Sequence, residues 1–223
     1  MKRYLYILLL ALLASSCMKA EMGDWVDIVA EAEATGQYLA ILTVKKTPTD
    51  SVYFQLNDST TIYASNYQDR YSRMERVFCD ITVTLKKVGR FNYTGMINWI
   101  ESLDEGKVTS DSTVPGTDGL DILNDWMTGV EDGYLTLHYS TFWGDGSVPH
   151  SLKLVTGENP EDPYEVRLVH LNNGDAALEE ADALIYFDLA SLPPTGGSGR
   201  KLTLKWKNGG GNTAKSFLYK SRQ

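Results

Sequence analysis

Cysteine is nearly absent from this chain, because Cys17 and Cys79 are the only two among its 223 residues. If Cys17 carries a modification, as argued below, Cys79 has no partner within the chain. A disulfide framework is thereby excluded, and the fold has to rest on an ordinary hydrophobic core.

The short motifs of common enzymes are also missing. The chain has no Gly-x-Ser-x-Gly nucleophile turn, no phosphate-binding loop and no His-Glu-x-x-His zinc pair. Cys79 is expected to point into a core, which removes the one other thiol as a nucleophile. We therefore predict no enzymatic activity and no cofactor.

Basic charge is in short supply, with 21 Lys and Arg against 29 Asp and Glu and a formal net charge of −8. Proteins bind phosphate backbones through Lys and Arg, which displace counterions. Nucleic acid is therefore excluded as an expected partner. Long apolar runs are scarce too, since the one run at residues 4–13 is too short to span a bilayer.

That run is part of a secretory signal peptide. Lys2 and Arg3 precede it, and Ala14, Ser15, Ser16 and Cys17 end it. Cys17 resembles the acylation site of a bacterial lipoprotein, in which the thiol takes a diacylglyceryl group and cleavage frees the amine. Each buried methylene of such a lipid contributes about 0.8 kcal/mol of membrane binding. We expect a lipid-anchored envelope protein, in the outer membrane of a Gram-negative bacterium; the alternative is an ordinary secretory signal.

The first half of the mature chain has the pattern of strands. Short β-branched and aromatic runs are separated by polar turns, at residues 38–44, 52–56, 61–64, 76–87 and 91–100. Alternation in the fourth run places Cys79 on its apolar face. Five short strands, with a long one late, favour a small closed barrel of the OB type, and an open meander is the alternative.

Residues 104–119 are polar, and we interpret them as a linker. Short strands then resume at 134–142, 150–156, 164–170, 184–189, 202–206 and 213–219, with a candidate helical turn after residue 175. This pattern is typical of an antiparallel β-sandwich. The predicted organisation is a signal peptide at 1–16, a lipidated tether at 17–36, an OB-like barrel at 37–103, a linker at 104–119 and a sandwich at 120–223.

Several segments carry a resemblance to a known family, namely 124–126 (NDW), 133–137 (GYLTL), 150–155 (HSLKLV), 168–175 (LVHLNNGD) and 186–189 (YFDL). Over nearly its whole mature length the chain resembles the NigD-like lipoproteins of Gram-negative anaerobes. The resemblance implies a lipid anchor, a small OB-like domain and a C-terminal β-sandwich. The family takes its name from a bacteriocin-associated gene cluster, and it supplies no catalytic or ligand site to carry over.

All three histidines lie in the second half of the chain. His150 opens one predicted strand and His170 closes the next, both on the inward side, so an antiparallel hairpin would make them neighbours. With Asp175 nearby they form a weak candidate zinc site, since imidazole and carboxylate bind zinc. The favoured alternative is that hydrogen bonds hold both rings and pin the hairpin, so we predict no metal.

Exposed aromatic residues are the better indication of binding. Trp143 lies beside a Gly-Asp-Gly loop, and Tyr53, Tyr63 and Tyr67 are expected on one outer face of the barrel, together with Tyr71 and Phe78. OB barrels bind oligosaccharides or oligonucleotides on such a face. The alternative is that these rings only cover the barrel or a domain contact.

Three functional hypotheses follow. The first is a non-catalytic envelope protein, attached to the membrane by its lipid, that binds a protein or glycan partner. The alternative is a hydrolase directed at envelope or other glycans, using carboxylates or a His150/His170 metal site. Self-protection against a bacteriocin is a third hypothesis, and it depends on the family name alone.

Overall fold

The computed structural model describes residues 35–68, 75–84, 87–114, 116 and 118–222. Strands dominate these residues, and the two helical segments are single 3-10 turns, η1 (Ser65–Tyr67) and η2 (Leu189–Ser191). The all-β class is therefore confirmed. Cys17, with the predicted signal peptide and nearly all of the tether, lies outside the described residues. In the described part of the chain, no helix has the length and apolarity needed to cross a membrane.

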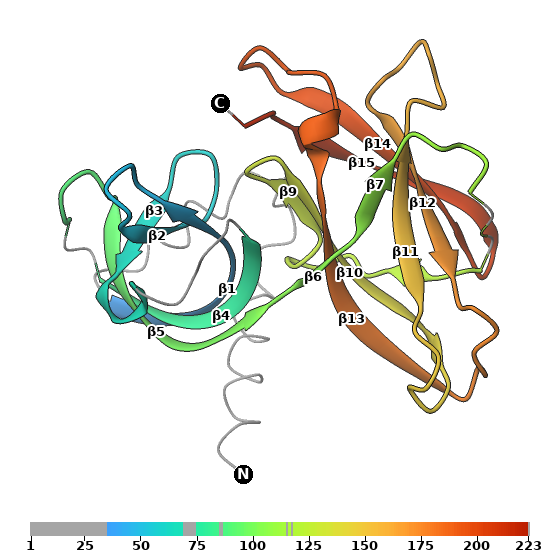
Figure 1. The fold of residues 1–223 in the computed structure, drawn as a ribbon, viewed down its shortest axis with the longest axis horizontal. Coiled ribbons are helices and arrows are strands. Elements are labelled where there is room, and N and C mark those ends of the chain that lie inside the picture. The colour runs from blue at the N-terminus through green and yellow to red at the C-terminus, as the bar shows by residue number, and fades with distance from the viewer. Residues whose placement is uncertain (1–34, 69–74, 85–86, 115, 117, 223) are drawn as a thin grey trace, which may run out of the picture. The chain divides into compact units, whose positions relative to one another are not determined.

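The first five strands close into a barrel in the order β1-β2-β3-β5-β4 (Figure 1). They are β1 (Thr35–Lys46), β2 (Val52–Gln55), β3 (Thr61–Ala64), β4 (Glu75–Thr84) and β5 (Tyr93–Ser102). β3 and β5 pair in parallel, whereas β1–β2, β2–β3 and β4–β5 are antiparallel hairpins. The closed barrel is the predicted OB-like arrangement, and the open meander does not form.

Alternating side chains fill the interior of the barrel. Phe54, Val77 and Cys79 are fully buried there. Cys79 thus faces inward as predicted, and burial, assisted by the charge of Asp80, raises the pKa of its thiol to about 12. The thiol stays protonated and unreactive at neutral pH.

The second half of the chain builds two five-stranded sheets (Figure 1). The first contains β6 (Asp104–Glu105), β13 (Glu179–Asp188), β10 (Tyr134–Trp143) and β8 (Asp121–Ile122), with β9 (Gly129–Glu131) also paired to β10. The second has the order β15 (Gly211–Tyr219), β14 (Arg200–Asn208), β12 (Glu165–Leu171), β11 (Ser151–Thr156) and β7 (Lys107–Thr109). Inward residues such as Leu137, Leu154 and Leu204 form their common core.

The structure differs from the expected linker at 104–119. β6 pairs in parallel with β13, and β7 pairs in parallel with β11, so this segment contributes a strand to each sheet. Two or three residues are too few for an alternating pattern, which is why the sequence gives no strand signal there. Two further differences are that β12 and β14 pair in parallel and that residues 179–183, expected near a helical turn, belong to β13.

A buried charge cluster lies at the turn between β9 and β10, and it consists of Lys45, Arg76, Glu131 and Asp132. Asp132 and Gly133 have φ values of 51° and 74°, the left-handed conformations that a two-residue hairpin turn requires. Lys45 Nζ donates to Asp132 Oδ1 at 2.7 Å. The Arg76 guanidinium lies 5.6 Å from the centre of the Tyr134 ring, so β1 and β4 are tied to this turn.

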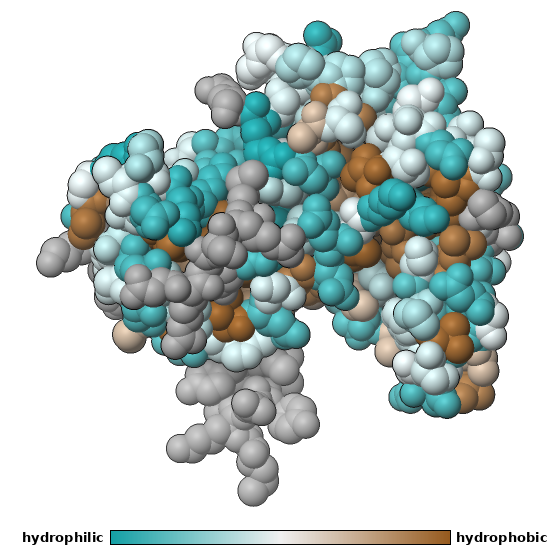
Figure 2. Space-filling view, viewed as in Figure 1, coloured by the Kyte–Doolittle hydropathy of each residue, from teal (hydrophilic) through white to brown (hydrophobic). Residues whose placement is uncertain are grey.

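On the face shown in Figure 2, hydrophobic residues form separate patches between hydrophilic ones. The exposed large apolar side chains are distributed over several strands and turns, namely Leu39, Val88, Met96, Trp99, Phe142, Leu178 and Leu218. Single exposed apolar residues are normal on soluble surfaces. A binding site therefore has to be identified from specific clusters.

Candidate functional site

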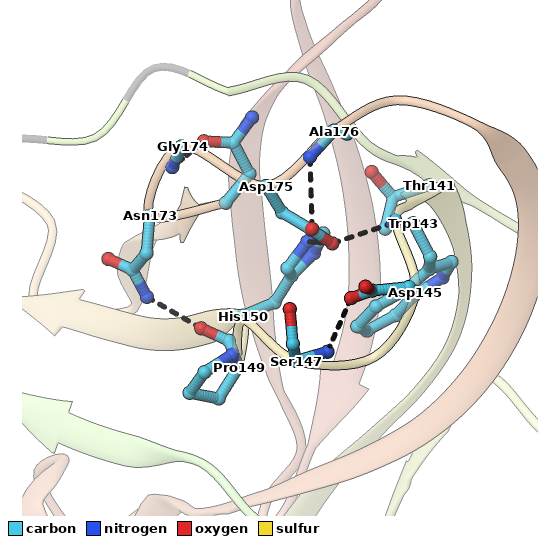
Figure 3. A network of polar contacts seen from close by, with 12 residues as sticks. Thr141, Trp143, Asp145, Ser147, Pro149, His150, Asn173, Gly174, Asp175 and Ala176 are labelled. Carbon is cyan, nitrogen blue, oxygen red and sulfur yellow. Dashed lines mark hydrogen bonds and ion pairs between the residues drawn. The ribbon is translucent and has the colours of Figure 1, made fainter.

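The structure brings His150, His170 and Asp175 together at one end of the β11–β12 hairpin. The pairing of Leu152 with His170 places His150 beside the end of β12. His150 Nδ1 lies 3.0 Å from His170 Nε2, and His150 Nε2 lies 3.2 Å from Asp175 Oδ2. Figure 3 shows the His150 ring directed toward the Asp175 carboxylate. The predicted proximity of the two histidines is present in the structure.

Asp175 also organises the adjacent loop. Its carboxylate accepts hydrogen bonds from the backbone of Gly144, at 2.7 Å, and Ala176, at 2.9 Å. The Gly144 contact, assisted by His150, lowers the pKa of the Asp175 carboxyl. The ionised carboxylate thus joins the loop after β10 to the turn before β13.

Trp143 belongs to the same cluster. Its ring stacks on His150 with centroids 4.1 Å apart and an interplanar angle of 16°. Its Nε1 donates to the carbonyl of Ala181 at 3.1 Å, and the ring packs against the sandwich core. The exposed loop position suggested by the sequence is not found, because β10 continues through Trp143 and directs the ring inward. A ligand role for Trp143 stays a prediction.

This cluster is closed by its own hydrogen bonds. One assignment of the ring protons satisfies both contacts of His150. In it, His170 Nε2–H donates to His150 Nδ1, and His150 Nε2–H donates to Asp175 Oδ2. Burial, and then the neighbouring His150, lowers the pKa of His170, which favours its neutral form. His170 Nδ1 is buried without a hydrogen-bond partner. Among the described residues, no three His, Cys, Asp or Glu side chains are arranged to hold a metal ion.

We expect His150→Ala to lower the free energy of unfolding by about 1–3 kcal/mol, because it leaves buried polar groups unpaired and removes the stack on Trp143. Urea denaturation of the purified protein measures this change. Ser147→Ala, in the exposed part of the same loop, is the control and should shift stability by less than about 0.5 kcal/mol. A stoichiometric metal in the purified wild type that is lost in His150→Ala would contradict a purely structural role.

The barrel carries an aromatic platform, which we define as Tyr53, Tyr63, Phe91 and Arg90. The Phe91 ring centroid lies 5.3 Å from that of Tyr53 and 5.5 Å from that of Tyr63, with the second pair stacked. The Arg90 guanidinium lies 5.7 Å from the Phe91 ring centre and 6.0 Å from that of Tyr53. β2, β3 and the β4–β5 connection each contribute to it.

The other predicted aromatic residues are placed elsewhere. Tyr67, in η1, packs partly buried against the barrel core. Phe78 contacts Trp99 and Trp126, at centroid distances of 5.6 Å and 6.1 Å. Tyr71 lies outside the described residues. Of the predicted set, the structure therefore joins Tyr53 and Tyr63, and it adds Phe91 and Arg90. Sequence reasoning missed these two because Arg90 was assigned to a turn and Phe91 only to the start of a strand.

A third network was missed entirely. His138 Nδ1 lies 2.5 Å from Asp125 Oδ2, and Nε2 lies 2.7 Å from Asp182 Oδ2. Burial opposes protonation, yet the hydrogen bonds to Asp182 and Asp125 prevail and raise the pKa of His138. The two carboxylates lie 13 and 44 residues away from His138 in sequence, so no local signal predicts them.

Comparisons with known proteins agree with this architecture. Residues 100–219, more than half of the chain, match the family described as the NigD-like C-terminal beta sandwich domain. No curated protein matches the chain.

Solved structures of similar fold come from species of Parabacteroides and Bacteroides. A protein described as toxin related, from Parabacteroides distasonis ATCC 8503, has a TM-score of 0.68 and 23% identity over 83% of this chain and 94% of that chain. A NigD-like immunity protein from Bacteroides caccae ATCC 43185 has a TM-score of 0.55 and 20% identity, over 82% and 96%. A protein described as a lipoprotein, from Bacteroides fragilis NCTC 9343, has a TM-score of 0.52 and 10% identity, over 84% and 100%. These likenesses show the fold, and the family match shows that the chain belongs to the family of proteins with a NigD-like C-terminal β-sandwich domain.

Proposed function

We propose that this protein is a non-catalytic, lipid-anchored envelope protein that binds a glycan on the aromatic platform of its barrel. The observation that carries the proposal is the cluster of three rings and one guanidinium on the outside of β2, β3 and the β4–β5 connection. In OB barrels the face of the second and third strands, flanked by loops, is the part that holds oligosaccharides.

The chemistry of the platform suits a sugar. Aromatic faces pack against the C–H surface of a sugar ring, and the exposed Arg90 supplies several hydrogen-bond donors for hydroxyl oxygens. A nucleic acid offers similar rings, but the net charge of −8 opposes its phosphates. A glycan is therefore the favoured ligand.

Two further points support the envelope placement and the absence of catalysis. Residues 1–17 have the pattern of a lipoprotein signal, and a protein of similar fold is described as a lipoprotein. The histidine cluster, which was the best enzymatic candidate, uses both nitrogens of His150 in internal hydrogen bonds. No observation favours the hydrolase hypothesis, and the likeness to an immunity protein leaves the partner in that system unspecified.

A glycan array followed by calorimetry on the best ligand tests the proposal. We expect Tyr63→Ala and Arg90→Ala each to weaken binding about tenfold or more, as for contacts worth at least about 1.4 kcal/mol. The reason is that each variant removes one stacking or donor group without emptying the barrel core.

Trp99→Ala is the matched control, because Trp99 is also an exposed aromatic residue of the barrel, at 44% exposure, but lies off the platform. It should bind as the wild type does. Equal binding by Tyr63→Ala and the wild type, or turnover of the bound glycan, would contradict the proposal.

A further inference from the structure

We infer that the outer face of the second sheet, β15-β14-β12-β11-β7, is a contact surface for the anionic lipid headgroups of the membrane that anchors the chain. The inference rests on the envelope placement in the proposed function, and it is independent of the glycan platform. It begins from the alternation of side chains along β14. Leu202 and Leu204 lie in the sandwich core, so the odd positions of this strand point outward.

The outward positions are predominantly basic. The strands place six basic side chains on this face, namely Lys107, Lys153, Arg167, Lys201, Lys205 and Lys207, and one acidic side chain, Glu165. Val155 and Val169 share this face but are buried, at 0% and 1% exposure, so its part over β11 and β12 is covered. The open part is that of β14 and β15, with Lys201, Lys205 and Lys207. The chain as a whole is acidic, with a net charge of −8. Positive charge is therefore concentrated on one face by the fold and not by composition.

Like charges stand directly opposite one another in this sheet. Lys107 pairs with Lys153 across β7 and β11, and Arg167 pairs with Lys205 across β12 and β14. Such pairs destabilise a sheet. Lys205 and Arg167 have carboxylate partners, Glu165 at 2.7 Å and Glu158 at 2.6 Å. In the part of the chain that the structure describes, Lys107, Lys153, Lys201 and Lys207 have no ion-pair partner within 4.0 Å.

The outer face of the first sheet has the opposite charge. Tyr134, Ser140 and Tyr186 point to this face, and the residues that pair with them point the same way. The strand positions of this face carry six acidic side chains, namely Glu105, Asp121, Glu131, Glu180, Asp182 and Asp188. Among the described strand positions of this face there is no Lys or Arg. Part of this acidic charge is balanced, because Arg76 and Arg222 lie over the Tyr134 ring and Arg222 pairs with Asp188. Glu131 adds charge only as pH rises toward its pKa of about 7. The two faces still differ in the sign of their strand residues, which favours one orientation at a charged surface.

A lipid surface fits this face better than a soluble anion. Lysines are compact point charges suited to a layer of headgroups, each contributing through the surface potential of anionic lipids. The face also presents Leu218, which is 59% exposed and pairs with Lys201 across β14 and β15. An apolar side chain beside basic ones is the pattern of interfacial contact. The expected lipid on Cys17 would hold the chain at the same membrane.

The test uses the mature, lipid-anchored chain on two kinds of vesicle, phosphatidylcholine alone and equal amounts of phosphatidylcholine and phosphatidylglycerol. Amine acylation followed by mass spectrometry measures the accessibility of each lysine. We expect Lys201, Lys205 and Lys207 to be protected several-fold on the anionic vesicles only, and the protection to disappear in high salt, which screens exposed charges. Lys201→Glu with Lys207→Glu should abolish the protection of Lys205, because each lysine removed weakens the membrane contact about fivefold.

Lys87→Glu, at an exposed position of the β4–β5 connection, makes the same charge change as each of these two substitutions. It is the control for net charge and should leave the protection intact. Equal labelling on both vesicles overturns the inference. Protection by soluble dextran sulfate but not by the anionic vesicles overturns it in favour of a soluble polyanion. If neither kind of vesicle retains the protein, the inference is overturned, because the protein is then not anchored at a membrane. Loss of glycan binding with intact protection would remove only the proposed glycan function.

Discussion

Replacing Asp132 with asparagine is expected to lower the free energy of unfolding by on the order of 3 kcal/mol, the cost of removing one partner from a buried ion pair. The Asp132 side chain is 5% exposed, and its carboxylate accepts a hydrogen bond from Lys45 Nζ at 2.7 Å. Burial lowers the pKa of the Arg76 guanidinium to about 10, and Asp132 is the leading group that opposes this shift. Without the carboxylate, the buried Arg76 and the partly buried Lys45 lose a neighbouring negative charge.

Asparagine is chosen because it tolerates the positive φ of this turn as well as aspartate does. The change therefore removes charge and leaves the backbone unstrained. Denaturation in urea, followed by circular dichroism, measures the loss.

The chain offers a matched control in Asp50→Asn. Asp50 also has a positive φ, of 66°, and pairs with a lysine, Lys46, at 2.9 Å, but its side chain is 82% exposed. Exposed pairs contribute about 0–1 kcal/mol. Equal losses in the two variants would show that burial of the Asp132 pair is unimportant.

Replacing Glu131 with glutamine is expected to stabilise the protein at neutral and alkaline pH. Burial, together with the charge of Asp58, raises the pKa of Glu131 from 4.5 to about 7, despite the opposing charges of Arg76 and Lys220. The folded state therefore holds this proton more tightly than the unfolded state. Stability is full below the unfolded pKa and falls as pH rises toward the folded pKa.

The loss amounts to about 3 kcal/mol, since one pKa unit corresponds to about 1.4 kcal/mol. Glutamine is neutral at every pH and removes this dependence. The stability curve of Glu131→Gln, measured by urea denaturation across the range from 4.5 to about 7, should diverge upward from that of the wild type. Glu179→Gln, at an exposed position, should follow the wild type. Parallel curves for Glu131→Gln and the wild type would refute the assignment.

The two predictions describe one buried charge cluster. A protonated Glu131 contributes no counter-charge, so Asp132 is left as the carboxylate that balances Lys45 and Arg76. Above the folded pKa of Glu131 a second carboxylate becomes charged in the same place. The Asp132→Asn loss should therefore be larger below this pKa than above it.

The sequence alone was sufficient for the strands of the barrel, because the signals there are local, whereas the structure decided between a closed barrel and an open meander. Val77 and Cys79 alternate with polar neighbours, and both prove to be fully buried. The hairpin argument for His150 and His170 also succeeded, since antiparallel pairing brings the start of one strand to the end of the next. These inferences needed only the two-residue period of a strand and the position of a turn.

Contacts between distant segments could not be predicted in this way. β6 and β7 are too short to show a period, and their partners lie in β13 and β11. Trp143 stacks on His150 because β10 extends beyond the expected strand end. His138 meets Asp125 and Asp182 only after three separate segments assemble. A sequence pattern indicates the periodicity of a single strand, but it does not indicate which other strands pair with it.

The distribution of charge separates most clearly what the sequence determines from what the tertiary structure determines. The sequence by itself determined that the chain is acidic overall. The structure extends the predicted strand at 202–206 to Arg200–Asn208, and alternation then puts Lys201, Lys205 and Lys207 on one face. Only the tertiary structure decided that Lys107, Lys153 and Arg167 lie on that same face of the second sheet. It also decided that the acidic residues of β13, which pairs with β10, lie on the outer face of the first sheet. The reason is physical: net charge is a sum over residues, whereas a charged face depends on which strands pair and in which register.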